Sequence, residues 1–279
     1  MVNFNGELMQ ENLLGFENRG YLYGDAVFET LRVVNQKVLF LEDHYFRLMA
    51  SMRICRMEIP MAFDLVFFEK ELLKVIDKPL GNYRVRFNVF RSFKAPSYAP
   101  FKNEITYFVE STELEQKELF YTILKHEYNV DLYKDFFVSK SLLSTIKTNN
   151  KMINVLASRF YLDFNLDNAL LLNTDKNLVE ATNSNIFLVI DNKLITPALS
   201  DGCLNGIIRK QLLTLFSRTN ALDLTIEERS ISPFELQKAE EVFLTNVVIG
   251  IQPITKYRKK KYPIEKVRGI LEMFNSKLI

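Results

Sequence analysis

The sequence predicts a mixed α/β (α+β) protein with two domains. Strand-like and helix-like patterns alternate along its 279 residues, a length that suits two packed domains. Hydrophobic residues make up 48% and charged residues 25% of the chain, as in ordinary globular proteins. The polar stretch 111–119 has few large apolar residues and is typical of a linker. We therefore expect a small N-terminal domain over residues 1–112, a linker over 113–119 and a large C-terminal domain over 120–279.

The N-terminal domain is expected to combine two capped helices with a sheet. Asp43 and Asp64 precede apolar residues at helical spacing, so each is predicted to cap a helix, the second running to about Asp77. Alternating residues predict strands on either side of these helices. Those strands are expected within 21–34 and over 37–41, 83–90 and 104–110.

The C-terminal domain is expected to begin with strands at about 120–128 and 136–139. A stripe including Met152, Val155 and Leu156 predicts a helix over 151–164. Asp191-Asn192 separates two β-rich runs and predicts a hairpin. The remaining expected elements are strands over 168–173, 178–179 and 241–244, and helices over 207–218, after the capping box 232–235, and over 264–278.

Charge and hydropathy exclude several classes of protein. The net charge is +2, which does not favour binding of nucleic acid, and the basic run 256–261 is interpreted as a solvated turn. The first residues lack the basic and apolar regions of a signal peptide, and no run reaches the roughly 20 apolar residues of a membrane span. Two cysteines do not indicate a disulfide framework. We expect a cytoplasmic protein without a metal site.

The stretch from Glu180 to Arg209 carries the most information about function. It contains a carboxylate, a polar turn, a hairpin and then a Gly-containing loop directly before a helix. Free backbone N–H groups and the positive end of the helix dipole meet at such a loop, so it can hold a phosphate without a basic side chain.

This stretch resembles the signature of the class IV aminotransferases, also called fold type IV pyridoxal-phosphate (PLP) enzymes. The resemblance covers nearly all of the chain and rests on the spacing of Glu180, Thr182, Asn185-Ile186-Phe187, Leu194, Thr196, Leu204, Gly206, Ile207 and Arg209. It implies two α/β domains with the cofactor in the cleft between them, and a homodimer. The family includes branched-chain and D-amino acid aminotransferases and aminodeoxychorismate lyase.

The resemblance assigns the two main catalytic positions. Lys147, in the segment Ile146-Lys147-Thr148-Asn149-Asn150, would form the Schiff base and later move a proton. Read alone, a lysine is usually a surface charge. Glu180 would keep the pyridine nitrogen protonated, because a pyridinium accepts electrons better than a neutral ring.

The phosphate of PLP is expected to be bound by Arg47 and by the loop Gly206-Ile207-Ile208, with Thr245 or Asn246 as further donors. The sequence departs from the family here. Many relatives have a threonine in place of Ile208 and a hydroxyl residue in place of Val247, and branched-chain enzymes have a tyrosine in place of Met152. Two missing hydroxyl contacts at about 1 kcal/mol each would weaken cofactor binding without abolishing it.

The substrate is expected to be held by Arg86, because a planar guanidinium suits bidentate binding of a carboxylate. Arg84 and Arg32 are second choices. Tyr23 and Phe28 would line the pocket, as the resemblance implies. His44 neighbours Arg47, but a packing or capping role is favoured over proton transfer.

Three functions follow from these residues. The first is a PLP-dependent aminotransferase acting on an amino acid, branched-chain-like, and a 2-oxo acid. The second is an aminodeoxychorismate lyase that makes 4-aminobenzoate and pyruvate, since the segments 21–32 and 83–90 resemble both groups. The third is a PLP-binding scaffold without turnover, which the pair Lys147 and Glu180 argues against.

Overall fold

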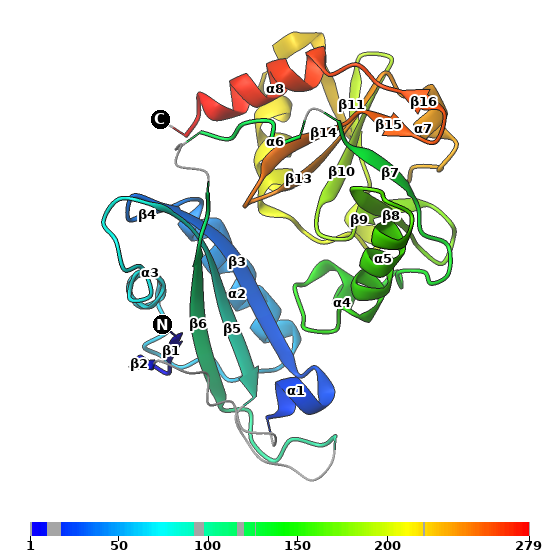
Figure 1. Cartoon of the computed structure of the whole chain (residues 1–279). Coiled ribbons are helices and arrows are strands. Elements are labelled where there is room, and N and C mark those ends of the chain that lie inside the picture. The colour runs from blue at the N-terminus through cyan, green and yellow to red at the C-terminus, as the bar shows by residue number, and fades with distance from the viewer. Residues whose placement is uncertain are drawn as a thin grey trace. The chain divides into compact units, whose positions relative to one another are not determined.

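The computed structural model describes residues 2–9, 18–91, 98–115, 120–125, 127–219 and 221–278 (Figure 1). The chain divides into two compact units. Unit 1 comprises Met1–Leu119 together with Ile146–Asn150, and unit 2 comprises Phe120–Thr145 together with Lys151–Ile279. The segment Ile146–Asn150 thus belongs to unit 1, although it lies within the range expected for the C-terminal domain. Residues 116–119 of the expected linker lie outside the described residues.

The described residues of unit 1 form one six-stranded sheet in the order β2-β1-β6-β5-β3-β4, in which every pairing is antiparallel. The strand β3 pairs over its whole length with β5, from Ala26 opposite Phe90 to Val34 opposite Asn82. The strands are β1 (Val2–Phe4), β2 (Glu7–Met9), β3 (Ala26–Val34), β4 (Lys37–Val38), β5 (Asn82–Arg91) and β6 (Ile105–Glu113).

Alternation along these strands gives the sheet two different faces. Val27, Leu31 and Phe87 point into the core, where they pack with the helices α2 (Leu41–Ile54) and α3 (Leu65–Leu73). The opposite face is more polar and carries Phe28, Thr30, Arg86 and Asn88, which are paired in register across β3 and β5. The short helix α1 (Arg19–Tyr23) precedes β3.

The two predicted helix caps of unit 1 have different outcomes. The prediction for Asp64 is confirmed, because its side chain accepts the N–H of Phe67 at 2.7 Å. The prediction for Asp43 is wrong, since α2 begins two residues earlier and Asp43 lies in its first turn. Phe40 takes the N-cap position in a left-handed conformation, and its own side chain makes no capping hydrogen bond. Asp43 still stabilises the helix through the dipole.

The described residues of unit 2 form two five-stranded sheets, in the orders β12-β11-β10-β13-β14 and β16-β15-β7-β8-β9. Asp191 and Asn192 both have positive φ and join β10 to β11, which confirms the predicted hairpin. The strands are β7 (Asn129–Leu132), β8 (Asn168–Leu172), β9 (Leu178–Ala181), β10 (Asn185–Ile190), β11 (Lys193–Thr196), β12 (Thr225–Glu228), β13 (Glu241–Asn246), β14 (Gly250–Ile254), β15 (Lys256–Tyr257) and β16 (Lys260–Lys261).

The helices of unit 2 pack on these sheets. Both α6 (Ile207–Arg218) and α8 (Glu265–Asn275) contact β13, and α5 (Met152–Asp163) contacts β8. Glu241 of β13 caps α8 from the sheet by accepting the N–H groups of Lys266 and Val267 at 2.9 and 2.8 Å. The remaining helices are α4 (Leu142–Thr145), α7 (Glu235–Lys238), η1 (Leu199–Asp201) and η2 (Ala221–Asp223).

The predictions for unit 2 have different outcomes. The described residues of 120–128 form no strand. The side chains of Asn275 and Gln252 bind the main-chain groups of Tyr121 and Lys125 that a neighbouring strand would need. The helix predicted over 151–164 is confirmed as α5, in which Phe160 of the apolar stripe packs with Ala157 while Met152 is 70% exposed.

Candidate active site

The lysine segment is an added edge piece of the sheet in unit 1. Phe28 donates its N–H to the carbonyl oxygen of Lys147 at 2.8 Å, and Asn149 donates its N–H to the carbonyl of Ala26 at 3.1 Å. Thr148 forms an antiparallel bridge with Val27. The Nζ atom of Lys147 lies 4.8 Å from the centroid of the Phe28 ring. The main chain on both sides of the lysine is therefore fixed, while its amine extends over an aromatic face.

Arg86 lies beside this lysine on the polar face of the same sheet. Its guanidinium carbon is 4.0 Å from the centroid of the Phe28 ring. Its Nε donates to Oδ1 of Asn88 at 3.0 Å, and its Nη2 donates to Oδ1 of Asn149 at 3.4 Å. Among the described residues its Nη1 has no hydrogen-bond acceptor, and no carboxylate pairs with the guanidinium. A half-buried cation of this kind can bind an anion.

The other sequence-predicted substrate residues are placed differently. Tyr23 lies on α1, where its ring contacts Tyr98 at 5.2 Å and lies under the guanidinium of Arg19 at 4.9 Å. Arg84 is exposed. Arg32 is fully buried and donates to Asn82 at 3.0 Å. The structure thus brings Phe28, Arg86 and Lys147 together, whereas Tyr23 packs against Tyr98 and Arg19.

Arg47 belongs to a buried charged cluster on the opposite face of β3. Its Nε and Nη2 donate to the two oxygens of Glu29 at 2.7 and 2.5 Å, and Nδ1 of His44 lies 2.6 Å from the same carboxylate. Burial alone would raise the pKa of Glu29, but the charge and hydrogen bonds of Arg47, with those of His44, lower it to about 2. Burial lowers the pKa of His44 below its usual value, which favours the neutral ring. Arg47 is therefore oriented by Glu29.

Sequence reasoning missed the role of Glu29. A signal was present, because this acid lies between Val27 and Leu31 on the apolar face of a predicted strand. A fully buried carboxylate needs a partner. The sequence could not show that the partners would be His44 and Arg47.

Glu180 is fixed within unit 2 on β9, where it is 9% exposed. Its Oε2 accepts the N–H of Leu204 at 2.9 Å, and the carbonyl of Leu204 accepts Nδ2 of Asn185 at 2.8 Å. A Cβ atom added at Gly206 would lie 1.9 Å from Oδ1 of Asn185. A larger residue at 206 would displace the side chain of Asn185. The bonds of Leu204 to Glu180 and Asn185 hold the loop before α6 against β9 and β10.

The N-terminus of α6 lies directly after this loop. Gly206 is the N-cap and has no side chain to cap the helix. As at every helix start, the first-turn N–H groups, including those of Ile207 and Ile208, have no intrahelical acceptor. Oγ1 of Thr245 is buried and has no hydrogen-bond partner among the described residues. Asn246 is occupied with its own turn, since its Oδ1 accepts the N–H groups of Val248 and Ile249 at 3.0 Å each.

Comparison with known proteins identifies the family. The family model described as amino-transferase class IV matches residues 26–257. The chain belongs to this family. It is 27% identical over 267 residues to D-alanine aminotransferase of Bacillus licheniformis, which covers 91% of this chain and 87% of that protein. It is 26% identical over 278 residues to aminodeoxychorismate lyase of Bacillus subtilis, covering 94% and 88%.

The fold of class IV aminotransferases is confirmed by solved structures. A branched-chain aminotransferase from Thermoproteus uzoniensis superposes with a TM-score of 0.87 at 23% identity, covering 99% of this chain and 94% of that one. Pyridoxal 5′-phosphate is the cofactor of the family. The predicted family, fold class and cofactor are thereby confirmed.

The residues of this class IV chain fit that cofactor. The orphaned hydroxyl of Thr245 and the uncapped first turn of α6 are donors suited to a phosphate. Among the described residues, no three His, Cys, Asp or Glu side chains gather in a way that could hold a metal ion. Across the same residues, helices are too short or too polar to cross a membrane.

Proposed function

We propose that this chain is a PLP-dependent aminotransferase that transfers the amino group of an amino acid, branched-chain-like, to a 2-oxo acid. The observation that carries the proposal is the fixing of Lys147. Its main chain is bonded to β3, and its Nζ lies over Phe28, the ring that also contacts Arg86, a guanidinium that pairs with no carboxylate of the described residues. Such placement suits a reactive amine, because a reacting group must be held in position.

Each proposed residue has one task. Lys147 Nζ would be the amine that holds the cofactor, and as a free amine it would carry the proton between the substrate Cα and C4′. Glu180 keeps a proton on the pyridine nitrogen. Arg47, the backbone N–H groups of Gly206, Ile207 and Ile208, and the hydroxyl of Thr245 would bind the phosphate, while Asn246, whose side chain is held by its own turn, would lie beside it. PLP, when bound, supplies the electron sink for the negative charge that develops at Cα.

The substrate carboxylate is assigned to Arg86. Asn88 and Asn149 hold its guanidinium by their side-chain oxygens, and Nη1 is left for an incoming anion. Phe28, which stacks under the guanidinium, and Tyr23 are proposed to line the apolar part of the site.

A second candidate is aminodeoxychorismate lyase, which makes 4-aminobenzoate and pyruvate. It is supported by the 26% identity to the Bacillus subtilis lyase, close to the 27% of the D-alanine aminotransferase. The proposed lysine and carboxylate serve both reactions, and the difference lies in the group that leaves after the proton at Cα is removed. A scaffold without turnover is the third candidate.

Single-turnover reactions of the purified protein separate these functions. An aminotransferase accumulates the pyridoxamine form with L-glutamate or a branched-chain amino acid, whereas a lyase releases pyruvate and 4-aminobenzoate without that form. Borohydride should place a label on Lys147. Lys147→Ala should fold and lose turnover, while Lys151→Ala, a control four residues along the chain, should keep it. Full activity in Lys147→Ala would falsify the lysine assignment, and inactivity of the wild type toward every substrate would favour the scaffold.

Two further proposals concern the setting of this enzyme. We propose a homodimer, as the family resemblance implies, which sedimentation of the purified chain tests. A cytoplasmic location is supported by Cys55 and Cys203, which are both free thiols and fit a reducing compartment. Fractionation of cells tests the location.

A further inference from the structure

The contacts that hold the lysine segment converge on five residues of unit 1, Gly24–Phe28, here called the platform. Phe28 donates its N–H to the carbonyl of Lys147, and the carbonyl of Ala26 accepts the N–H of Asn149. The carbonyl of Gly24 also accepts Nδ2 of Asn150 at 3.2 Å. With the bridge between Thr148 and Val27, four successive residues of the segment are thus attached to one short stretch. Any shift of the platform would move Lys147 with it.

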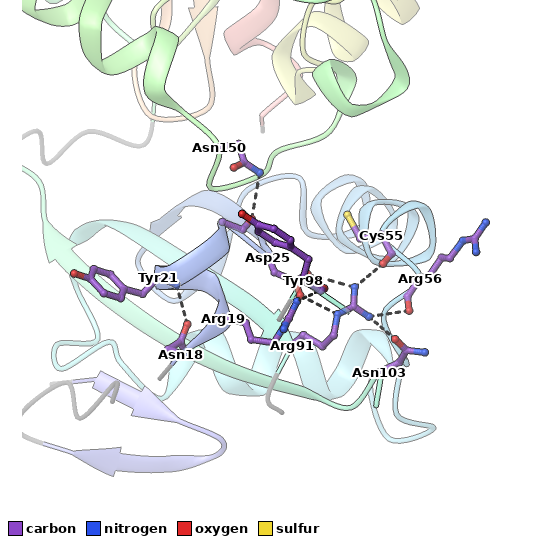
Figure 2. A network of polar contacts seen from close by, with 11 residues as sticks. Asn18, Arg19, Tyr21, Asp25, Cys55, Arg56, Arg91, Tyr98, Asn103 and Asn150 are labelled. Carbon is purple, nitrogen blue, oxygen red and sulfur yellow. Dashed lines mark hydrogen bonds and ion pairs between the residues drawn. The ribbon is translucent and has the colours of Figure 1, made fainter. Parts of the chain in front are cut away.

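Asp25 is the charged residue of the platform, and it is bound by two arginines (Figure 2). Its Oδ2 accepts Nε of Arg19 at 2.9 Å and Nε of Arg91 at 3.0 Å, and its Oδ1 accepts Nη2 of Arg91 at 3.3 Å. The carbonyl of Asp25 also accepts the N–H of Arg91 at 3.4 Å. The platform is therefore tied both to α1 and to the end of β5.

Arg91 extends this attachment to two more parts of unit 1 (Figure 2). Its Nη2 donates to the carbonyl of Cys55 at 2.8 Å, at the end of α2. Its Nη1 donates to the carbonyl of Arg56 at 3.1 Å and to Oδ1 of Asn103 at 2.6 Å. All five N–H donors of the guanidinium have acceptors. Arg91 thus serves as a structural connector with no donor left for a substrate.

The charges of this cluster are poorly exposed, so they depend on one another. The side chains of Arg19, Arg91 and Asp25 are 3%, 7% and 17% exposed. Burial alone would raise the pKa of Asp25, but the hydrogen bonds from Arg91 and Arg19 outweigh it and lower the pKa. Neutralising Asp25 would leave two buried guanidinium groups without their shared carboxylate, which is strongly unfavourable.

We propose that Asp25 is a positioning residue for Lys147. The carboxylate fixes the platform through Arg19 and Arg91, and the platform fixes the main chain of the lysine segment. The inference rests on the proposed function only where it says that the position of Lys147 matters for catalysis. A displacement of about 1 Å at a reacting group can lower a rate about 100-fold.

Hydrogen–deuterium exchange of the apoprotein tests the physical link without cofactor. Asp25→Asn keeps the shape and removes the charge. It should raise the exchange rate of the Phe28 and Asn149 amides at least tenfold. Glu71→Gln is the matched control, because Glu71 is a buried carboxylate of the same unit whose partners Asn3, Lys74 and Tyr107 do not touch the platform. It should leave these two amides unchanged.

Unchanged protection of both amides in Asp25→Asn would overturn the proposal, as would equal loss in the control. If Asp25→Asn does not fold, Arg91→Lys replaces it, since lysine keeps the charge but has three donors instead of five. The same result is expected, and wild-type protection in Arg91→Lys would overturn the proposal.

A second test uses the holoenzyme and measures the pH titration of the visible absorbance band, which a residue that only stabilises the fold would not change. Asp25→Asn should shift the pH titration of the visible absorbance band and lower kcat at least tenfold, and Asp25→Glu should restore part of both. Glu71→Gln should lower the thermal midpoint without either effect. If exchange responds but borohydride labels another lysine, the link from Asp25 to the segment holds and the proposed function fails, so the two outcomes are distinguishable.

Discussion

Oε2 of Glu180 accepts the backbone N–H of Leu204 at 2.9 Å. This bond joins strand β9 to the loop before α6 across 24 residues of sequence. The proposed partner of the pyridine nitrogen and the proposed phosphate loop are therefore parts of one rigid piece of unit 2. Asn185 strengthens the joint by binding the carbonyl of the same Leu204 at 2.8 Å.

This relationship makes Glu180→Gln informative. Glutamine keeps an oxygen for the N–H of Leu204, so the thermal midpoint should change little. It removes the negative charge, and a hydrogen bond to a charged group contributes about 1.5–3 kcal/mol. We expect kcat to fall about 10- to 150-fold. Steady-state kinetics checks the fall in kcat, and thermal unfolding checks the unchanged midpoint. Wild-type turnover in the variant would exclude the proposed role.

Gly206→Ala should weaken cofactor binding. The added Cβ would meet Oδ1 of Asn185 at 1.9 Å, so Asn185 must leave the carbonyl of Leu204 and the loop must move. We expect the Kd for PLP to rise at least tenfold, measured by titrating the apoprotein. Gly269→Ala on α8 is the control, because its nearest neighbours are 3.5 Å away in ordinary contact. It should stabilise the fold by about 0.5–1 kcal/mol, and equal PLP affinity in both variants would contradict the prediction.

The Glu29 cluster should make folding stability depend on acid. The folded pKa of Glu29, about 2, lies below its unfolded value of 4.5, so the unfolded state binds more protons between these values. The associated stability is present above pH 4.5 and is lost as pH falls toward 2, and it corresponds to about 3 kcal/mol. The lowered pKa of His44 acts in the same direction, beginning as pH falls below its ordinary value of 6.5.

Denaturant unfolding at a series of pH values checks this cluster. Glu29→Gln should flatten the loss of stability below pH 4.5, because the titrating group is removed. It should also weaken PLP binding, since Arg47 loses the carboxylate that orients it. A variant with the acid sensitivity of the wild type would show that other carboxylates dominate.

Val247→Thr should strengthen cofactor binding. Val247 is 8% exposed and follows Thr245 and Asn246. The family resemblance leads us to expect a hydroxyl residue at this position. Threonine has nearly the same shape and adds one donor, worth about 1 kcal/mol. We expect the Kd for PLP to fall about fivefold. Val248→Thr is the control, because the N–H of Val248 is already bound to Asn246. Equal affinities of both variants would count against a phosphate contact at residue 247.

Local signals in the sequence predicted those elements whose cause is itself local. Asp64 caps α3 and Asp191-Asn192 forms the hairpin because cap and turn chemistry act over three or four residues. The expected strand at 120–128 failed, because distant side chains of Asn275 and Gln252 bind the main chain there. The helix predicted over 151–164 formed as α5, but only part of its apolar stripe is buried, since Phe160 packs inward and Met152 is exposed.

The sequence by itself determined the family and the identity of the candidate lysine and carboxylate, because their spacing around the signature is a property of the chain. Only the tertiary structure decided their surroundings. Glu29 meets His44 and Arg47, and Asp25 meets Arg91 across 66 residues. Buried charges must find partners wherever the fold brings them, and sequence periodicity carries no record of contacts made over such separations.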